Sequence, residues 1–495
     1  MTTLIEKWPN SPSAPLPLLQ RTKTRTRQLL RLVWRTLSKA APRFELGIKD
    51  LQSSALPLGH AAARETQFPA ADRISHSASS LLVICNGHGE DLIALRVLEA
   101  LHRKCPNLPI EVLPLVGVGQ AFEHALAAGW LKRLGPSAPL PSGGFSNQSL
   151  RGLIADLAAG LTLLSWRQWR CVRRSAKTGK AILAVGDLLP LLMAWSSGGT
   201  YGFIGTPKSD YTWRSGPGRA LSDHYHRLKG SEWDPWEWAL MRSSRCRVVA
   251  VRDHLTARGL RRHGVAATAP GNPMMDGFKV ESSPAALNRC RRLLLLCGSR
   301  MPEAGTNFKR LLEGLGQLDS DLPLAVLVAF GSQPSLNQLE AILRTDGYLP
   351  STPPIDTLGA KACWVKGTQL LLLGPGQFNR WAAWTEVGLV TAGTATEQLV
   401  GLGIPALSMP GPGPQFKRQF AIRQSRLLGG AVLPCQSKEE LAERLQRLLK
   451  DDSLRQRLGR IGNRRMGTAG GSAALAALIS QLLLGHRRAP RQCSV

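Results

Sequence analysis

The chain has 495 residues, of which 43% are hydrophobic, so it is long enough for two globular domains with cores of their own. Its 63 Lys and Arg residues outnumber its 34 Asp and Glu residues, which gives a formal net charge of +29. Such a charge suits anionic partners, namely nucleic acid, an anionic membrane or an anionic substrate. Charges or breaks interrupt every long apolar stretch, so we expect no integral membrane protein.

The cysteines and the distribution of basic residues exclude further classes of protein and partner. The nine cysteines are odd in number and form no Cys-x-x-Cys pair, so we expect neither a zinc site nor a disulfide framework, and a reducing cytoplasm fits. Basic residues occur throughout the chain without a strong lysine run or an aromatic RNP-like motif. We therefore expect no specific nucleic-acid partner, no metal and no cofactor. A basic enzyme at an anionic membrane surface explains the charge.

Residues 1–78 form a predicted basic extension ahead of the first domain. Within it, residues 25–39 place Leu29, Val33 and Leu37 on one helical stripe and arginines on another, which is typical of an interfacial helix. A disordered basic tail, a transit-like presequence or a start codon assigned too early explains the same composition.

Residues 79–278 are predicted to form a first, Rossmann-like domain. Apolar runs alternate with helical stretches there, and this alternation indicates a parallel, doubly wound α/β sheet. The expected strands are 81–85, 110–116, 181–185 and 247–251, and the expected helices are 91–104, 121–128, 150–175 and 255–263. The segment 198–238 has little periodicity and many Gly and Trp residues. We interpret it as a loop-like insertion that contacts lipid or saccharide, or that packs onto the domain.

The turn after the first expected strand carries polar residues where ligands bind in such sheets. It consists of Asn86, Gly87, His88, Gly89 and Glu90. Leu92 occupies the third glycine position of the dinucleotide fingerprint, which disfavours NAD or FAD. We interpret the turn as acceptor-binding, with His88 as a catalytic candidate. A helix N-cap by Glu90 or Asp91 is the alternative.

Asp187 follows the expected strand 181–185, so its carboxylate is predicted to lie at the mouth of the first domain's cleft. A carboxylate in that place can take the proton from an acceptor hydroxyl, and Asp187 is therefore our candidate general base. The alternative is a purely structural N-cap for the helix that follows.

Residues 279–485 are predicted to form a second Rossmann-like domain, followed by a basic tail at 486–495. The Gly- and Pro-rich segment 271–277 marks the connection. The expected strands are 292–297, 324–330, 369–373, 388–391 and 406–409, again interleaved with helices.

Two turns of the second domain suit phosphate. The first is Gly298-Ser299-Arg300 after a strand, where the planar fork of the arginine matches phosphate oxygens. The second is Gly393-Thr394-Ala395-Thr396-Glu397, where a glycine turn opens a helix with unpaired N–H groups. A capping box of Thr394 and Glu397 and a solvated Arg300 are the structural alternatives. Gln415 and Gln419, beyond a later glycine turn, are weaker candidates for nucleotide or donor-sugar binding.

These motifs together resemble the lipid-A-disaccharide synthases, and most closely the lipid-A-disaccharide synthase-related proteins known mainly from cyanobacteria. The resemblance covers roughly residues 80–480. It rests on the turn 87–91, Val185-Gly186-Asp187, the segment 271–276, and the two phosphate-directed turns.

The resemblance implies the two-domain GT-B glycosyltransferase architecture, with the UDP-sugar in the carboxy-terminal half and the acceptor in the amino-terminal half. It also implies inversion at the anomeric carbon without a metal, and Asp187 falls where the family's proposed catalytic aspartate lies. The chain departs from the true synthases on the acceptor side: His88-Gly89-Glu90-Asp91 replaces a Ser-Gly-Asp pattern, and residues 205–213 replace a Ser-Pro-x-x-Trp-Ala-Trp segment.

The leading hypothesis is a cytoplasmic glycosyltransferase, peripheral to the inner membrane. It would move a hexosyl or N-acetylhexosaminyl group from a UDP-sugar to a lipid-linked acceptor. A UDP-sugar 2-epimerase, which shares the two-domain fold, is the second hypothesis. A non-catalytic lipid- or nucleic-acid-binding protein is the third.

Overall fold

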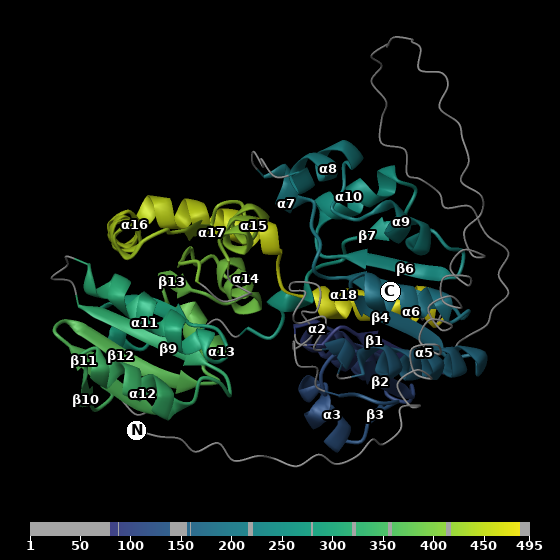
Figure 1. The fold of residues 1–495 in the computed structure, drawn as a ribbon, viewed down its shortest axis with the longest axis horizontal. Helices are drawn as coiled ribbons and strands as arrows, with labels where there is room; N and C mark the ends of the chain where they lie inside the picture. The colour runs from purple at the N-terminus through teal and green to yellow at the C-terminus, as the bar shows by residue number, and fades with distance from the viewer. Residues whose placement is uncertain are drawn as a thin grey trace, which may run out of the picture. The chain divides into compact units, whose positions relative to one another are not determined.

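The structure is a computed structural model that describes residues 80–87, 89–138, 156–158, 160–215, 221–278, 281–318, 323–354, 359–411 and 417–485. Figure 1 shows two β-sheets, each with helices on both faces. The two-sheet α/β arrangement confirms the predicted fold class. The predicted helix at 25–39, the tail at 486–495, His88 and Gln415 lie outside the described residues.

The first sheet is parallel throughout, with the strand order β3-β2-β1-β4-β5-β6-β7. Its strands are β1 (Leu81–Cys85), β2 (Ile110–Pro114), β3 (Leu131–Arg133), β4 (Ala181–Gly186), β5 (Tyr201–Gly205), β6 (Cys246–Val251) and β7 (Ala267–Thr268). The chain direction across the sheet reverses between β1 and β4. In doubly wound sheets this switch point, at the carboxyl ends of the strands, is where ligands bind.

Alternate side chains of β1 pack against helices on opposite faces of the first sheet. Val83 belongs to one buried cluster with α2 (Gly89–Lys104), and Ile84 belongs to another with α5 (Leu161–Lys177) and α6 (Leu188–Ser196). A strand buried on both faces has to be apolar at every position, which is why this run was recognisable from the sequence. The remaining helices of this half are η1 (Gln120–Phe122), α3 (Glu123–Ala127), α7 (Tyr211–Arg214), α8 (Leu221–Lys229), α9 (Pro235–Met241) and α10 (His254–Arg262).

The predicted loop-like insertion at 198–238 is wrong, because β5 lies within it as an inner strand of the first sheet and α7, α8 and α9 follow it. Two glycines in β5 interrupt the run of apolar residues that marks a buried strand. Neighbouring side chains leave no room for a larger residue at either position. A Cβ at Gly205 would lie 2.6 Å from the Trp233 ring, and one at Gly202 would lie 3.2 Å from a Leu483 methyl group. Glycine in a strand commonly marks such a close approach.

The second sheet has the order β10-β11-β12-β9-β8-β13-β14-β15. Its strands are β8 (Arg291–Leu296), β9 (Leu324–Phe330), β10 (Leu349–Ser351), β11 (Ala362–Lys366), β12 (Gln369–Pro375), β13 (Val387–Val390), β14 (Ala406–Ser408) and β15 (Val432–Pro434). The predicted strands are confirmed within a few residues. The strands β10 and β11, which pair antiparallel at one edge, were not predicted because they are short and partly exposed.

Helices cover both faces of the second sheet and continue beyond it (Figure 1). They are α11 (Glu303–Gly316), α12 (Leu336–Thr345), α13 (Phe378–Trp381), η6 (Ala382–Trp384), α14 (Thr394–Gly401), α15 (Arg418–Leu427), α16 (Lys438–Lys450), α17 (Asp452–Met466) and α18 (Gly471–Leu478), followed by a π-helical turn, η7 (Ile479–Leu483). Two short 3₁₀ turns, η3 (Pro273–Met275) and η4 (Ala285–Leu287), lie in the segment that connects β7 to β8.

The last helix packs with the first sheet rather than the second. Leu475 in α18 joins the buried cluster that contains α2 and β1, and Figure 1 shows α18 beside α2. The predicted boundary at residue 485 therefore places α18 in a different half from the one that it contacts. The segment 452–483 is long and apolar enough for a membrane span by length and composition alone. Its apolar side chains at 475, 476, 479 and 483 are buried in the core.

Asp276 in the connecting segment holds the start of α18. Its carboxylate accepts a hydrogen bond of 2.7 Å from the Ser472 amide and another from the Gly470 amide. Gly471 lies so close to the connection that a Cβ there would be 2.6 Å from the backbone nitrogen of Asn272. The Gly- and Pro-rich connection is thus a packed junction that returns the chain end to the first sheet.

Candidate active site

Two polar residues meet at the switch point of the first sheet. The Asn86 amide nitrogen, after β1, donates a hydrogen bond of 2.6 Å to the Asp187 carboxylate, after β4. The same carboxylate oxygen accepts from the Leu189 amide at 3.2 Å, so the N-cap interpretation of Asp187 is confirmed. The cap does not remove the carboxylate from the edge of the sheet, where Asp187 keeps partial solvent exposure.

The turn after β1 packs closely against Val116, in the segment that follows β2, and only a glycine fits at position 87. Its φ of 93° is in the left-handed region, and a Cβ there would lie 2.6 Å from the Val116 carbonyl oxygen. The Gly87 amide donates to the buried Asp91 carboxylate at 3.0 Å. The predicted N-cap alternative is wrong for both acidic residues, because α2 begins at Gly89 and Glu90 and Asp91 lie inside its first turn. Asp91 is a structural residue that ties the turn after β1 to the helix.

The carboxyl group of Glu90 is strongly perturbed. Burial first, and then the nearby carboxylates of Asp187, Asp91 and Glu397, raise the pKa of Glu90 to about 7, against a backbone hydrogen bond that lowers it. A carboxyl group with such a pKa exchanges a proton near neutral pH. It is also close enough to sense Glu397, which comes from the other sheet.

The predicted helix start in the second half is confirmed, and it has no side-chain cap. Gly393 is the N-cap residue of α14, and no side-chain hydrogen bond caps the helix there. The capping-box alternative is therefore wrong, because Thr394 already lies inside the helix. Thr396 is buried, and its hydroxyl donates to the Ala392 carbonyl at 2.7 Å, so it closes the turn instead of facing a ligand.

Strand pairing brings the two phosphate-directed turns together. β8 and β13 are parallel neighbours, with Leu296 opposite Val390, so the turns that follow them lie side by side. A Cβ at Gly298, whose φ is 91°, would lie 3.5 Å from the Thr391 carbonyl oxygen. Ser299 is exposed, and Arg300 is partly buried, which lowers the pKa of its guanidinium. A helix N-terminus and an arginine side chain are both groups that can bind phosphate oxygens.

The start of α14 approaches the start of α2. A Cβ at Gly89 would lie 3.0 Å from the Thr394 hydroxyl oxygen. Beside this contact, Arg252 forms an ion pair of 2.7 Å with Glu397. The turn after β1 and the start of α14 are therefore in close contact, and the ion pair joins the two halves beside them.

Arg252 is the main residue of this site that the sequence did not reveal. It comes directly after β6, whereas Arg300 comes four residues after the end of β8, and this position at the end of a strand was the available signal. Gln424 was also missed. Its amide nitrogen donates to the Gly393 carbonyl at 3.2 Å and supports the turn before α14, whereas the predicted Gln419 is exposed.

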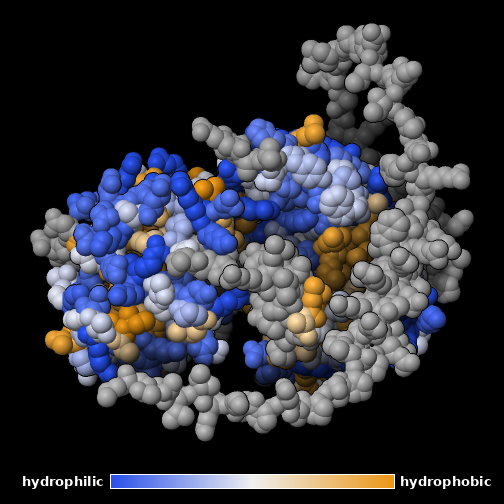
Figure 2. Space-filling model, in the orientation of Figure 1, coloured by the Kyte–Doolittle hydropathy of each residue, from blue (hydrophilic) through white to orange (hydrophobic). Residues whose placement is uncertain are grey.

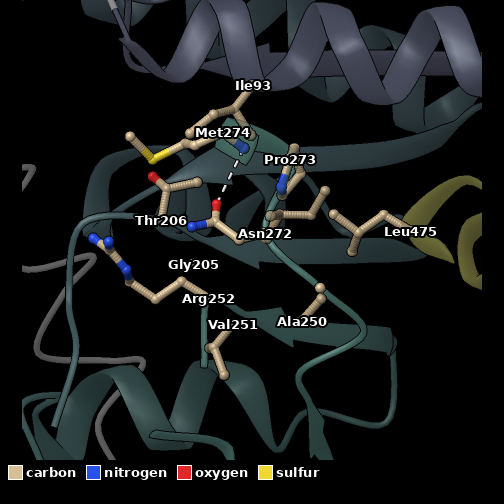
Figure 3. A pocket seen from close by; sticks show the side chains of 12 residues that line it. Ile93, Gly205, Thr206, Ala250, Val251, Arg252, Asn272, Pro273, Met274 and Leu475 are labelled. Atoms are coloured by element: carbon tan, nitrogen blue, oxygen red, sulfur yellow. Dashed lines mark hydrogen bonds between the residues drawn. The ribbon is translucent and has the colours of Figure 1, made fainter. Parts of the chain in front are cut away.

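A small pocket lies behind the ion pair, at the carboxyl ends of β5 and β6 (Figure 3). Arg252, Thr206 and Asn272 are among the residues that line it. The Thr206 hydroxyl is buried without a hydrogen-bond partner among the described residues. Asn272 accepts from the Met274 amide at 3.1 Å, which Figure 3 shows, and donates to the Met466 carbonyl at 3.1 Å. Asn272 is thus a structural residue of the junction.

No protein-family model matches the chain, and no curated protein matches it. Solved structures with a similar fold include CalG4, the calicheamicin glycosyltransferase, at 16% identity and a TM-score of 0.49, over 82% of this chain and 99% of that chain. MurG of Acinetobacter baumannii is similar at 14% identity and a TM-score of 0.47, over 81% and 99%. A protein described as a UDP-N-acetylglucosamine 2-epimerase from Listeria monocytogenes is similar at 11% identity and a TM-score of 0.48, over 81% and 94%.

These TM-scores are below 0.5, so the fold assignment rests on the strand orders of the two sheets and the function is argued from the site. The three structures named above do not single out the lipid-A-disaccharide synthases, and no sequence match does so, so that resemblance stays a prediction.

Proposed function

We propose that the protein is a glycosyltransferase that moves a hexosyl or N-acetylhexosaminyl group from a UDP-sugar to a lipid-linked acceptor, with inversion and without a metal. The observation that carries the proposal is the approach of two turns. The uncapped start of α14, beside the Arg300 turn, lies against the carboxylate-bearing start of α2. In this proposal, the diphosphate site would face the proton-accepting site.

The carboxy-terminal half would hold the UDP. The first N–H groups of α14 and the positive end of its helix dipole would bind diphosphate oxygens, and the Arg300 fork would bind others. Both groups would also stabilise the negative charge that builds up on UDP as it leaves, since they are held in place before the reaction.

The amino-terminal half would activate the acceptor. Its hydroxyl oxygen would attack the anomeric carbon as the bond to UDP breaks, and a carboxylate would take the hydroxyl proton. A single displacement of this kind inverts the anomeric centre. The pKa of Glu90, raised to about 7, suits this step, whereas the position of Asp187 is fixed by Asn86 and the α6 amide.

The acceptor and the location complete the proposal. A lipid-linked acceptor places the enzyme at the cytoplasmic side of the inner membrane as a peripheral protein. This part rests on the net charge of +29 and on the resemblance to the lipid-A-disaccharide synthases.

The first test is a calorimetric titration of the full chain with UDP in the presence of EDTA. We expect saturable binding that Arg300→Ala weakens at least about tenfold, as the loss of a charge-assisted hydrogen bond does. Glu397→Ala should also weaken it, because this change removes the ion pair with Arg252 that holds the first turn of α14. Arg447→Ala, which changes an exposed arginine on α16, is the matched control and should bind as the parent does. A folded parent that does not bind UDP would refute the donor assignment.

A second test separates transfer from epimerisation. UDP-N-acetylglucosamine is incubated with the protein, with and without a membrane lipid extract, and the sugar nucleotide and lipid products are separated. Release of UDP that depends on the extract supports transfer. Conversion of the sugar nucleotide without the extract would instead support a UDP-sugar 2-epimerase.

A further inference from the structure

One face of the first half carries exposed apolar residues beside basic ones. On α5, the side chains of Leu163 and Trp166 are 50% and 49% exposed. On α6, which covers the same face of the sheet, Leu189 and Leu192 are 37% and 39% exposed. Large apolar side chains grouped in this way mark an interaction site more often than scattered single ones do.

The orientation of α5 is fixed by contacts on its inner side. The buried Gln168 amide donates to the carbonyls of Leu115 at 3.1 Å and Pro136 at 3.2 Å. Trp169 donates from its indole nitrogen to the Ser196 hydroxyl at 3.0 Å, which ties α5 to α6. Leu163 and Trp166 cannot turn inward without breaking these bonds, so the apolar face stays directed outward.

The charge of α5 has a single sign. Its sequence contains no Asp or Glu, and its basic residues are Arg167, Arg170, Arg173, Arg174 and Lys177. The Arg170 guanidinium lies 4.7 Å from the centre of the Trp166 ring, so the aromatic and cationic groups form one surface. Tryptophan with arginine beside aliphatic residues is typical of the boundary between lipid head groups and acyl chains.

The apolar face continues to the mouth of the candidate site. Leu189 lies two residues after Asp187, at the first turn of α6, so the exposed apolar residues reach the edge of the sheet that carries Asp187. Figure 2 shows hydrophilic residues over much of the visible surface, interrupted by an apolar area in the region where Figure 1 labels α6 and α18. A lipid held against this face would present its head group at the carboxylates.

We propose that the face formed by Leu163, Trp166, Leu189, Leu192 and the α5 arginines docks onto an anionic lipid bilayer. The proposal rests on the proposed function for its purpose, because it specifies from which side a lipid-linked acceptor reaches the site. Its physical basis is separate: the aliphatic residues gain from entering the interface, and the arginines gain from anionic head groups. A nucleic acid would use the arginines but would leave Leu189 and Leu192 without a role.

The test is sedimentation of the full chain with vesicles of phosphatidylcholine and phosphatidylglycerol at three to one, and with vesicles of phosphatidylcholine alone. We expect strong preference for the anionic vesicles. Leu163→Glu with Trp166→Glu should lower the partition coefficient at least about tenfold, because two apolar contacts are lost and two like charges are added. Arg167→Gln with Arg170→Gln should lower it about thirtyfold, at roughly 1 kcal/mol per arginine.

Matched controls lie on the same half of the chain. Leu228 on α8 is 89% exposed and Trp236 on α9 is 54% exposed, so Leu228→Glu with Trp236→Glu makes the same chemical change away from the face. We expect this control to bind vesicles as the parent does. If the glutamate variant of α5 unfolds by circular dichroism, the glutamine pair of α5 serves as the test, since it leaves the apolar residues in place.

Two outcomes would overturn the proposal: α5 variants that bind vesicles like the parent, or a control pair that loses binding as strongly. A parent that prefers transfer RNA over vesicles, with the preference lost in the arginine variant, would assign the face to nucleic acid instead. UDP titration of the same variants keeps the two proposals apart. Loss of vesicle binding with unchanged UDP binding concerns the docking face alone, and absence of UDP binding in the parent concerns the donor site alone.

Discussion

Arg252 and Glu397 form a 2.7 Å ion pair between the carboxyl end of β6 and the start of α14. The two side chains are 7% and 16% exposed, so solvent screens the pair only partly. The pair holds the first turn of the proposed UDP-binding helix against the half that carries Glu90. It therefore couples the stability of the chain to the geometry of the site.

Removal of one partner of this pair should be strongly destabilising. Arg252→Ala leaves the Glu397 carboxylate partly buried and uncompensated, and we expect a loss of about 3 kcal/mol in the free energy of unfolding. Arg252→Met with Glu397→Gln removes both charges and should cost less than the single change. Urea unfolding measures both, with Arg447→Ala as the control. Equal losses in the single and double variants would contradict this account of the pair.

Glu90 should make stability depend on pH in a specific direction. Burial raises the pKa of Glu90 from 4.5 to about 7, so between these values the folded state holds a proton that the unfolded state has lost. Stability should therefore fall as the pH rises through this window, by on the order of 2 kcal/mol in total. Glu90→Gln should abolish this part of the dependence. Urea midpoints at pH 5 and pH 8 test it, and an unchanged dependence in Glu90→Gln would contradict it.

The same pKa predicts the pH dependence of transfer. If Glu90 is the general base, the rate should rise with pH and level off above about 7, because only the ionised carboxylate accepts a proton. Asp187→Asn removes a negative neighbour and should shift this inflection to lower pH. A profile of the rate against pH measures the shift. Loss of the inflection in Asp187→Asn, with the inflection kept in Glu90→Gln, would make Asp187 the base.

Arg300→Lys should weaken UDP binding although it keeps the positive charge. A lysine cannot form the two parallel hydrogen bonds of the arginine fork, so we expect roughly a tenfold rise in the dissociation constant. Calorimetry with UDP measures it. A lysine variant that binds like the parent would show that Arg300 acts as a point charge only.

Gly471 should not tolerate a side chain, whereas Gly316 should. A Cβ at Gly471 would lie 2.5 Å from the Asn272 carbonyl carbon, so Gly471→Ala should displace α18 at a cost of about 2 kcal/mol or more. Gly316, the last residue of α11, has open space around it, and Gly316→Ala should be neutral or stabilise by about 0.5 kcal/mol. Hydrogen exchange of α18 amides should be faster in the first variant alone. Unchanged exchange and stability would contradict the packing of this junction.

Local chemistry was enough to predict several elements from the sequence. The runs at 81–85 and 324–330 were predicted as strands with the bounds that the structure has, because strands buried on both faces are apolar throughout. The glycine turn at Gly393 was predicted as a helix start because a strand, a glycine and a helical stretch follow one another within a few residues. These signals lie within single segments of the chain, so the sequence by itself determined the α/β class and the positions of the two glycine turns after β8 and β13.

Tertiary structure decided what depends on segments far apart in the chain. β5 was missed because its glycines are required by Trp233 and Leu483, whose positions local sequence does not reveal. The pairing of β8 with β13, which joins the Arg300 turn to the α14 turn, follows from strand order alone. Arg252 pairs with Glu397 only because the fold brings the carboxyl end of β6 next to the start of α14. Each of these relations is a contact between distant residues, which no local pattern of hydrophobicity or turn residues encodes.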